Sequence, residues 1–253
     1  MNFSFHTISW ALIRFPYLDI ERTFEMIKNA GFSGVEGVSI NDEKKLVDIV
    51  CIAKEKGLSI VAISSSDINN GIKFSAAIGC EFYQIGGWYR DKLITGNLKE
   101  DLKLCVNEFE EIGKYAKKYG IKIAVHPHLN QIIENLEEIE FLMENSENIY
   151  LLIDTAHQYA ANVDPIKLFL KFKNRVAHIH LKDCKGKEFV PLGEGKVEIE
   201  KFLDTLKENG YKNWVGVELD RKIDWLKDKN FLSVVEKNIK KISSFLKKTG
   251  YLK

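Results

Sequence analysis

Eight short apolar or β-branched runs alternate with longer amphipathic segments along the whole sequence, and this alternation limits the possible folds more than any other feature. The short runs have the length of strands, and the longer segments repeat apolar residues at helical spacing. Strands are expected at 3–8, 34–38, 59–64, 82–86, 122–127, 150–154, 176–182 and 214–219. Helices are expected at 20–29, 43–56, 70–78, 98–119, 135–145, 165–172, 199–208 and 232–246.

Eight strand–helix units predict a single (β/α)8 TIM barrel domain over residues 1–253. Several expected helices stop at a glycine suited to the left-handed C-terminal position, as at Gly31 and Gly120. Asp164 precedes Pro165, a capping residue before proline at the first helical position. A doubly wound open sheet is the structural alternative. No glycine-rich phosphate loop follows the first strand, and eight strands fit closure better.

Composition restricts the partners and the compartment. The 37 basic and 36 acidic residues give a net charge of +1, which offers no electrostatic case for nucleic acid or an anionic membrane. The four cysteines lack paired metal-type spacing, so free thiols in a cytoplasmic protein are expected. No secretory signal or bilayer-spanning run is visible. The sequence leaves open whether the chain forms a homo-oligomer.

The run 176–183, Val-Ala-His-Ile-His-Leu-Lys-Asp, carries the most unusual chemistry in the chain. Alternation along a strand puts His178, His180 and Lys182 on one face. Two imidazoles and an amine on a buried strand need partners. A satisfied core histidine with a solvated lysine is the simpler interpretation, and the neighbouring strands weigh against it.

Four consecutive strands of the second half each end in a group that can bind a metal. The fifth strand gives His126, the sixth Asp154, the seventh His180 and the eighth Glu218. The carboxyl ends of barrel strands meet at one rim, where active sites form. Two imidazoles and two carboxylates suit Mn²⁺, Co²⁺, Zn²⁺ or Fe²⁺ better than Mg²⁺ or Ca²⁺. The sequence therefore predicts one divalent metal site at this rim, with a structural helix cap as the alternative for any single carboxylate.

Other polar and aromatic groups at strand exits are expected to complete the pocket: His6, Trp10, Glu36, Trp88, His128 and His157. The ring faces of tryptophan suit the C–H surface of a sugar, although ordinary packing is the alternative. The alternative for Glu36 is a helix cap. The segment 189–196 has two glycines around one acid and is expected either to fold over the site as a lid or to form a plain turn.

At these residues the sequence resembles the xylose-isomerase-like barrel superfamily, which holds sugar and sugar-phosphate isomerases and epimerases, inosose dehydratases and metal-dependent apurinic endonucleases. The likeness covers nearly the whole chain, and its motifs are specific for the superfamily but weak for any one substrate. They lie at 8–10, 30–36, 154–157, 180–183, 191–195 and 217–218.

The resemblance implies a metal held by Glu, Asp, His and Glu from strands five to eight. The last three match Asp154, His180 and Glu218, whereas His126 stands where the isomerases and epimerases usually carry glutamate. The His-Pro-His run at 126–128 looks more like the inosose dehydratase branch. This departure puts a symmetric mechanism with two glutamate bases in doubt.

We therefore expect a divalent-metal-dependent isomerase or epimerase that forms a metal-stabilised enediolate from a small polyhydroxy carbonyl substrate, a carbohydrate or cyclitol. Glu218 is the expected base, Glu36 or His157 relays protons, and Lys182 stabilises oxyanion charge or holds a hydroxyl or phosphate. The alternatives are an inosose dehydratase-like lyase and a non-catalytic metal- or sugar-binding barrel. The endonuclease is the weakest alternative, because the near-neutral charge gives no support for a basic DNA groove.

Overall fold

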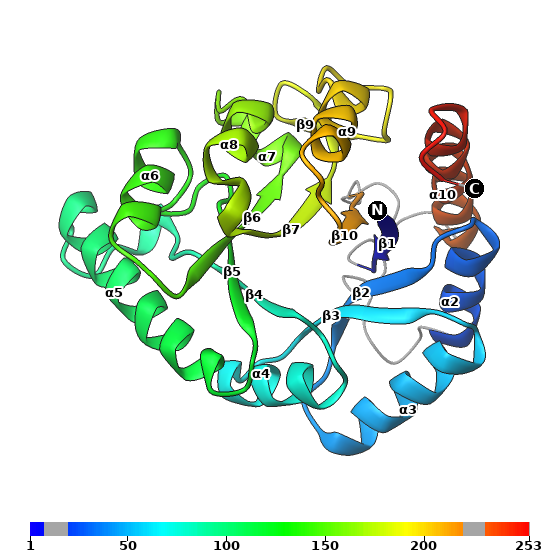
Figure 1. Cartoon of the computed structure of the whole chain (residues 1–253), viewed down its shortest axis with the longest axis horizontal. Helices are drawn as coiled ribbons and strands as arrows, with labels where there is room; N and C mark the ends of the chain where they lie inside the picture. Colours follow the sequence, from blue (N-terminus) through cyan, green and yellow to red (C-terminus); the bar gives the residue numbers. More distant parts are fainter. Residues whose placement is uncertain (8–19, 220–230, 253) are drawn as a thin grey trace.

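A computed structural model describes residues 1–7, 20–219 and 231–252. Eight parallel strands form a nearly closed barrel with helices around its outside (Figure 1). The strands are β1 (Asn2–His6), β2 (Gly34–Ser39), β3 (Ser59–Ser64), β4 (Phe82–Gly86), β5 (Lys122–His126), β6 (Ile149–Asp154), β7 (Val176–Leu181) and β10 (Trp214–Val217). They are hydrogen-bonded in the order β3-β2-β1-β10-β7-β6-β5-β4, and β3 lies beside β4 where the barrel meets. The predicted (β/α)8 barrel is confirmed.

The described helices follow the predicted pattern closely. They are α2 (Ile20–Asn29), α3 (Glu43–Glu55), α4 (Ile68–Ala77), α5 (Leu98–Lys117), α6 (Leu136–Glu144), α7 (Thr155–Ala160), α8 (Pro165–Phe172), α9 (Ile199–Glu208) and α10 (Phe231–Lys248), with the 3₁₀ turns η1 (Arg90–Lys92) and η2 (Lys173–Arg175). Asp164 caps α8 as expected, accepting hydrogen bonds from two N–H groups of its first turn. Gly31 and Gly120 have positive φ angles of 100° and 72°, in keeping with the predicted helix ends.

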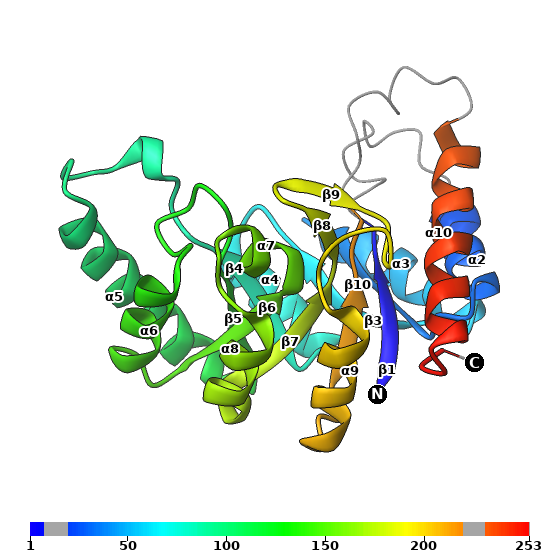
Figure 2. The same cartoon turned by 90° about the horizontal axis from the view of Figure 1, so that it is seen from above.

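Three local features differ from the expectation. Helix α4 begins at Ile68 rather than at 70, because Asp67 caps it through the N–H of Asn70. Helix α7, directly after β6, was not predicted. A short antiparallel hairpin, β8 (Asp183–Lys185) with β9 (Glu188–Val190), occupies part of the segment after β7. Figure 2 shows this hairpin above the carboxyl ends of the barrel strands.

The core lies between the strands and the surrounding helices and is almost wholly apolar. A second, smaller apolar cluster includes Val61, Phe82, Ala124 and Leu152, one from each of β3 to β6. The ring of Phe82 stacks on that of His178, with centroids 4.5 Å apart. This stack marks the level at which the apolar layer gives way to polar side chains.

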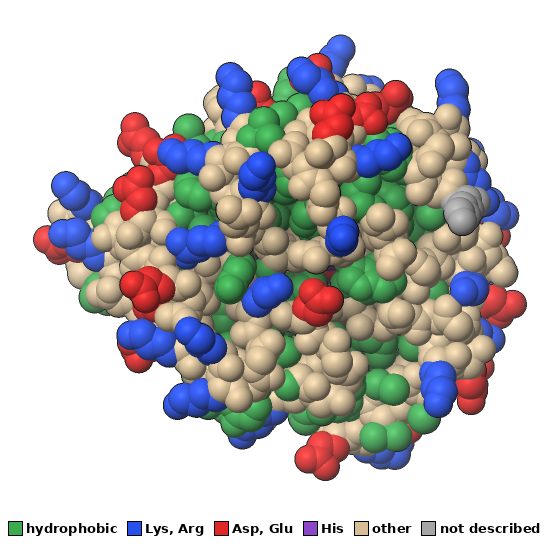
Figure 3. All heavy atoms as spheres, viewed as in Figure 1, with side chains coloured by type: hydrophobic (Ala, Val, Ile, Leu, Met, Phe, Trp, Pro, Cys, Tyr) green, Lys and Arg blue, Asp and Glu red, His purple; other side chains and the backbone are tan. Residues whose placement is uncertain are grey.

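The described surface carries charges of both signs. On the face in Figure 3, lysine and arginine side chains alternate with aspartate and glutamate, in keeping with the near-neutral sum. Among the described helices, none combines the length and apolar content that a membrane crossing requires.

Helix α5 approaches the start of β6 through Gly113. A Cβ atom on Gly113 would lie 2.7 Å from the carbonyl oxygen of Asn148. The carboxylate of Glu110 holds this segment by accepting the N–H groups of Glu147 and Asn148, each at 3.0 Å. The segment therefore has little freedom to move away from a larger side chain.

We expect Gly113→Ala to lower the free energy of unfolding by about 1–3 kcal/mol, because the new methyl group meets held backbone. At an unpacked helix position the same change would raise stability by about 1 kcal/mol, so the sign is informative. Urea unfolding followed by circular dichroism measures the effect. Asn107→Ala, on the exposed face of the same helix, is the control and should change little. A Gly113→Ala chain as stable as the parent would contradict the close packing.

Candidate active site

Strand register brings the predicted site residues to one rim of the barrel. Asp154 of β6 pairs with His180 of β7, and His6 of β1 pairs with Glu36 of β2. Gly216 of β10 pairs with His180, so Glu218 follows just above that level. Residues at equal heights on parallel strands point into the barrel together. With His126 from the end of β5, the carboxyl ends of six strands therefore meet at a single polar cluster.

The other three predicted metal ligands lie around the ring of His180. Its Nδ1 atom lies 2.8 Å from Oε2 of Glu218. On the other side, Nε2 of His126 lies 3.6 Å from Oδ2 of Asp154. Ligand atoms of His126, Asp154 and His180 all fall within 4.8 Å of one another, as do those of His6, His180 and Glu218. His180 belongs to both sets and is the geometric centre of the cluster.

Asp154 has one oxygen for the fold and one for the site. Its Oδ1 atom accepts the N–H groups of Ala156 and His157, both at 2.9 Å, and so caps α7. Its Oδ2 atom is buried without a hydrogen-bond partner among the described residues. The helix-cap interpretation and the ligand interpretation thus apply to different atoms of the same carboxylate.

The side chains present fit a divalent cation. Beside Oδ2 of Asp154, the buried atoms without a well-aligned hydrogen bond include Nε2 of His126 and both ring nitrogens of His180. Buried polar atoms without hydrogen bonds are costly, and a bound ion is one of the few ways to satisfy several at once. Imidazole nitrogens with carboxylate oxygens are typical ligands of Zn²⁺, Mn²⁺, Co²⁺ and Fe²⁺.

Lys182 is fully buried beside this cluster. Its Nζ atom lies 3.0 Å from Oε1 of Glu218 and 3.7 Å from Oδ2 of Asp154. The same atom is 3.5 Å from Nε2 of His157 and 4.2 Å from the centre of the Phe189 ring. The ammonium group therefore has carboxylates on one side and an aromatic face on the other.

These contacts shift the pKa values of the buried acids and of His180. Burial alone would raise the pKa of Glu218, but Lys182 and His180 hold it well below its ordinary value. Burial would lower the pKa of His180, yet Glu218 and Glu36 raise it to about 10. The metal-free site thus contains an ionised glutamate in contact with a protonated histidine.

His6 and His157, also at the rim, are neutral. Burial lowers the pKa of His157 to about 2 and that of His6 to about 4. The rings of His128 and His157 lie 3.7 Å apart between centroids, and His126 meets both edge-on. The side of the rim near β5 and β6 therefore presents three imidazole rings in mutual contact.

Glu36 lies deeper than expected for a group that meets substrate. It is fully buried, its Oε2 atom is 2.8 Å from Nε2 of His178, and its Oε1 atom accepts the hydroxyl of Ser4 at 2.8 Å. His178 and Ser4 were not among the predicted site residues. The sequence did hold a signal for His178, which shares its strand face with His180.

Trp88 packs, half-buried, against the apolar core, and its carbonyl accepts the N–H of Ile132 at 2.7 Å. Trp10 lies outside the described residues. The aromatic side chain that meets the cluster is Phe189 of the β8–β9 hairpin, which contacts both His157 and Lys182.

The segment expected as a lid or turn is anchored by Asp183. One carboxylate oxygen accepts the N–H groups of Gly193 and Gly195, and the other accepts those of Cys184 and Val197. Three of these four hydrogen bonds come from residues 193–197 and hold that stretch in place against one buried side chain. Of the expected segment, Phe189 on the hairpin reaches the site.

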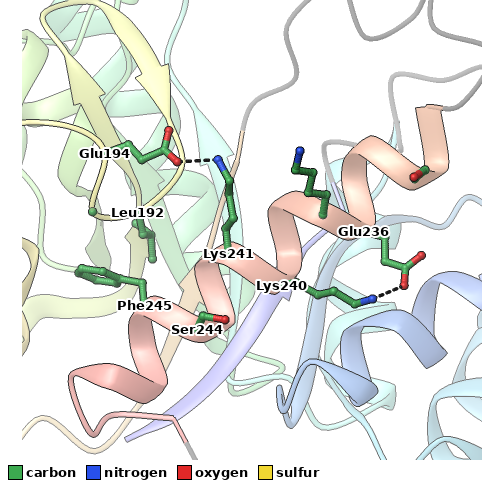
Figure 4. Close-up of a pocket in the computed structure, with 10 residues that line it drawn as sticks. Leu192, Glu194, Glu236, Lys240, Lys241, Ser244 and Phe245 are labelled. Atoms are coloured by element: carbon green, nitrogen blue, oxygen red, sulfur yellow. Dashed lines mark hydrogen bonds and ion pairs between the residues drawn. The ribbon is translucent and has the colours of Figure 1, made fainter.

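A large groove of about 670 Å³ lies apart from the cluster, along α10. Figure 4 shows that Lys241 and Glu194 face each other across it, while Lys240 pairs with Glu236 on the helix itself. Its basic groups are thus largely neutralised by neighbouring acids. The buried histidines and carboxylates of the rim do not line it.

A barrel whose strand ends gather buried histidines and carboxylates has the arrangement of metal-dependent (β/α)8 enzymes. The chain belongs to the xylose isomerase-like TIM barrel family, whose family model matches residues 24–249.

Curated relatives of this chain are enzymes. It is 24% identical over 262 residues to an inosose dehydratase of Clostridium botulinum, covering 85% of this chain and 88% of the relative. It is 30% identical over 144 residues to the inosose dehydratase of Clostridium beijerinckii, an alignment that covers 49% of this chain and spans about half of the relative (48%).

Solved structures share the fold at low identity. The IolI protein with a bound zinc atom superposes with a TM-score of 0.73 at 17% identity, covering 99% of this chain and 96% of that one. The apo form of the Escherichia coli 3-keto-D-glucoside 4-epimerase YcjR gives a TM-score of 0.74 at 15% identity, covering 96% and 99%.

We expect the metal-free chain to be most stable near pH 6.5. Below that pH, His6 and His157 become protonated in the unfolded chain. In the folded chain they stay neutral, because their pKa values are lowered to about 4 and about 2. The free energy of unfolding therefore falls as the pH falls. Above that pH, His180 loses its proton in the unfolded chain but keeps it in the folded chain, where its pKa is about 10. The stabilisation that His180 provides is therefore lost as the pH rises. Urea unfolding in a chelator from pH 4 to 9 tests this. His6→Gln should reduce the acid-side slope by about 1.4 kcal/mol per pH unit, and a slope unaltered by this change would contradict the assignment.

We expect Zn²⁺ or Mn²⁺ to bind the parent chain and Asp154→Asn to weaken binding at least about 100-fold, because an amide replaces a buried ligand oxygen. Isothermal titration calorimetry measures the dissociation constant. Asp164→Asn is the matched control, since Asp164 caps α8 through the same kind of N–H contacts away from the rim. Equal losses in both variants would show that capping, not coordination, explains the effect.

Proposed function

We propose that this chain is a divalent-metal-dependent enzyme that removes a proton from the carbon next to the carbonyl of a small polyhydroxy substrate, a carbohydrate or cyclitol. The observation that carries the proposal is the contact of ionised Glu218 with Lys182 and His180 at the rim where metal-ligand side chains converge. Such proton removal is the first step of isomerisation, epimerisation and dehydration alike.

His126, Asp154, His180 and Glu218 would hold the cation. A bound divalent ion polarises a carbonyl group and so acidifies the neighbouring C–H bond. The pKa of Glu218 lies well below its usual range in the metal-free chain, so Glu218 is a weak base there. A weak base suffices only for a strongly acidified C–H bond, which ties its role to the metal.

The two oxygens of Glu218 have separate partners. Oε2 faces His180 and Oε1 faces Lys182. We assign ligation to the first and proton removal to the second. The ammonium of Lys182, only 3.0 Å from Oε1, is placed to stabilise negative charge that develops on the substrate oxygen or to return a proton to it.

The fate of the proton distinguishes the possible reactions. Isomerisation needs one base that moves a proton between neighbouring carbons, while epimerisation needs a second base on the opposite face of the substrate. In the described part of the rim, the side near β5 and β6 presents the imidazoles of His126, His128 and His157. The carboxylate on this side, Asp154, caps α7 with Oδ1 and would hold the cation with Oδ2. Epimerisation would therefore require one of these imidazoles to return a proton to the opposite face of the substrate, whereas isomerisation would require Glu218 alone.

Dehydration is the second candidate, and the asymmetry of the rim favours it. Elimination needs one base and one acid: Glu218 takes the proton, and Lys182 or His157 protonates the departing hydroxyl. Nζ of Lys182 lies 3.5 Å from Nε2 of His157, so a proton can pass between them. The inosose dehydratase names of the curated relatives support a keto-cyclitol as the substrate of this alternative.

The metal and the compartment are part of the same proposal. The ligand types favour Mn²⁺, Co²⁺, Zn²⁺ or Fe²⁺, and the zinc atom in the IolI structure supports an ion of this group. The four cysteines are free thiols, three of them buried. We infer from them that the chain works in the reducing cytoplasm.

We expect the metal-loaded parent chain, in deuterium oxide, to incorporate deuterium into a ketose or inosose, and Glu218→Gln to lower the rate at least about 1,000-fold. Nuclear magnetic resonance follows the exchange, and metal content is measured on the same samples. Glu194→Gln, an exposed glutamate paired with Lys241, is the control. Loss of water from an inosose, seen as the ultraviolet absorption of a conjugated product, identifies a dehydratase.

Two results would contradict the proposal. Full exchange by metal-loaded Glu218→Gln would remove this residue as the base. A parent chain that binds metal yet exchanges no C–H hydrogen in ketoses, their phosphates or inososes would be a binding protein.

A further inference from the structure

We propose that Glu36 is a positioning residue that orients His180 for metal binding and does not itself meet substrate. The inference rests on the metal site of the proposed function and deepens it. It names a buried network of Ser4, Glu36 and His178 beneath the cluster as the support of its central ligand.

Both oxygens of Glu36 are already engaged inside the barrel. Oε2 lies 2.8 Å from Nε2 of His178, and Oε1 accepts the hydroxyl of Ser4 at 2.8 Å. An ionised carboxylate only accepts hydrogen bonds, so Nε2 of His178 carries the hydrogen. Ser4, Glu36 and His178 have no exposed surface. A group so placed is poorly suited to exchange protons with substrate.

The same oxygen also faces His180. Its separation from Nε2 of His180 is 3.6 Å, while Nδ1 of that ring points to Oε2 of Glu218 at 2.8 Å. The ring of His180 therefore lies between two carboxylates, one below and one at the rim. At 3.6 Å the lower contact acts through charge and not as a hydrogen bond.

This arrangement selects the nitrogen that binds metal. A metal-bound imidazole uses the lone pair of one nitrogen and keeps its hydrogen on the other, and a carboxylate near the second nitrogen fixes that choice. Glu36 holds the hydrogen on Nε2, so the lone pair of Nδ1 faces Glu218 and the rim. The first histidine of the His-Ile-His run thus orients Glu36, and Glu36 orients the second histidine.

A glycine makes room for the network. Gly216 pairs with His180 in the sheet, and a Cβ atom there would lie 1.8 Å from Oε1 of Glu36 and 2.9 Å from Nε2 of His178. Any other residue at 216 would displace the Glu36–His178 pair. The chain therefore leaves open the space that the carboxylate occupies.

The test is the affinity and spectrum of bound Co²⁺, which report on the site without turnover. We expect Glu36→Gln, which keeps the shape but removes the charge, to raise the Co²⁺ dissociation constant about 10- to 100-fold and shift the visible bands. Binding should still saturate at one ion per chain. Asp101→Asn, another fully buried carboxylate on α5, is the matched control and should bind like the parent.

The outcomes separate this inference from the proposed function. A folded Glu36→Gln chain whose dissociation constant lies within threefold of the parent overturns it. If that variant does not fold, Glu36→Asp decides by the same threefold limit, because its shorter side chain withdraws the charge from His180. A parent that binds one Co²⁺ but exchanges no substrate hydrogen overturns the enzyme and leaves the positioning role standing. A parent that binds no Co²⁺ overturns both.

Discussion

The structure depends on neutralising carboxylates inside a closed barrel. Asp154 and Glu218 are buried at the rim, Glu36 is buried beneath them, and the ammonium of Lys182 is buried with them. Three carboxylates and one ammonium carry a net charge of −2, which a divalent cation cancels. In the metal-free chain the raised pKa of His180 supplies part of that compensation by holding a proton. Metal binding and proton loss from His180 are thus two ways of meeting one electrostatic demand.

In this region, the side chains that build the site also hold the backbone in place. Asp154 caps α7 with one oxygen and presents the other to the cluster. Thr155 links β6 to β7, because its hydroxyl accepts the N–H of Lys182 at 2.9 Å and lies 2.6 Å from the carbonyl oxygen of the same residue. The segment that follows β6 therefore fixes the height of Lys182 relative to Asp154. Such contacts between side chains and backbone keep the side chains of a site preorganised.

Sequence reasoning recovered the barrel and the residues at the rim because both depend on local patterns. Strand and helix periodicity, glycine ends and the Asp164 cap are all visible within a few residues. The deeper network of Ser4, Glu36 and His178 could not be predicted, because it depends on how far each strand is staggered against its neighbour. Helix α7 was missed because it has only six residues, too few for a helical periodicity to show. The hairpin was missed because its strands are three residues each, too short for a periodic signal.

The clamp formed by Asp183 has a consequence for how this site can diverge. The hairpin leaves the barrel next to Asp183 and the chain returns to the same carboxylate at residues 193–197. Both ends of this segment are therefore held by the carboxylate of Asp183, whatever residues lie between them. Changes in the length or sequence of the tip, including the position held by Phe189, can reshape the mouth of the barrel while the strand below stays in register. Substrate selectivity in such a protein can therefore change through the hairpin, without changes to the side chains at the ends of the barrel strands.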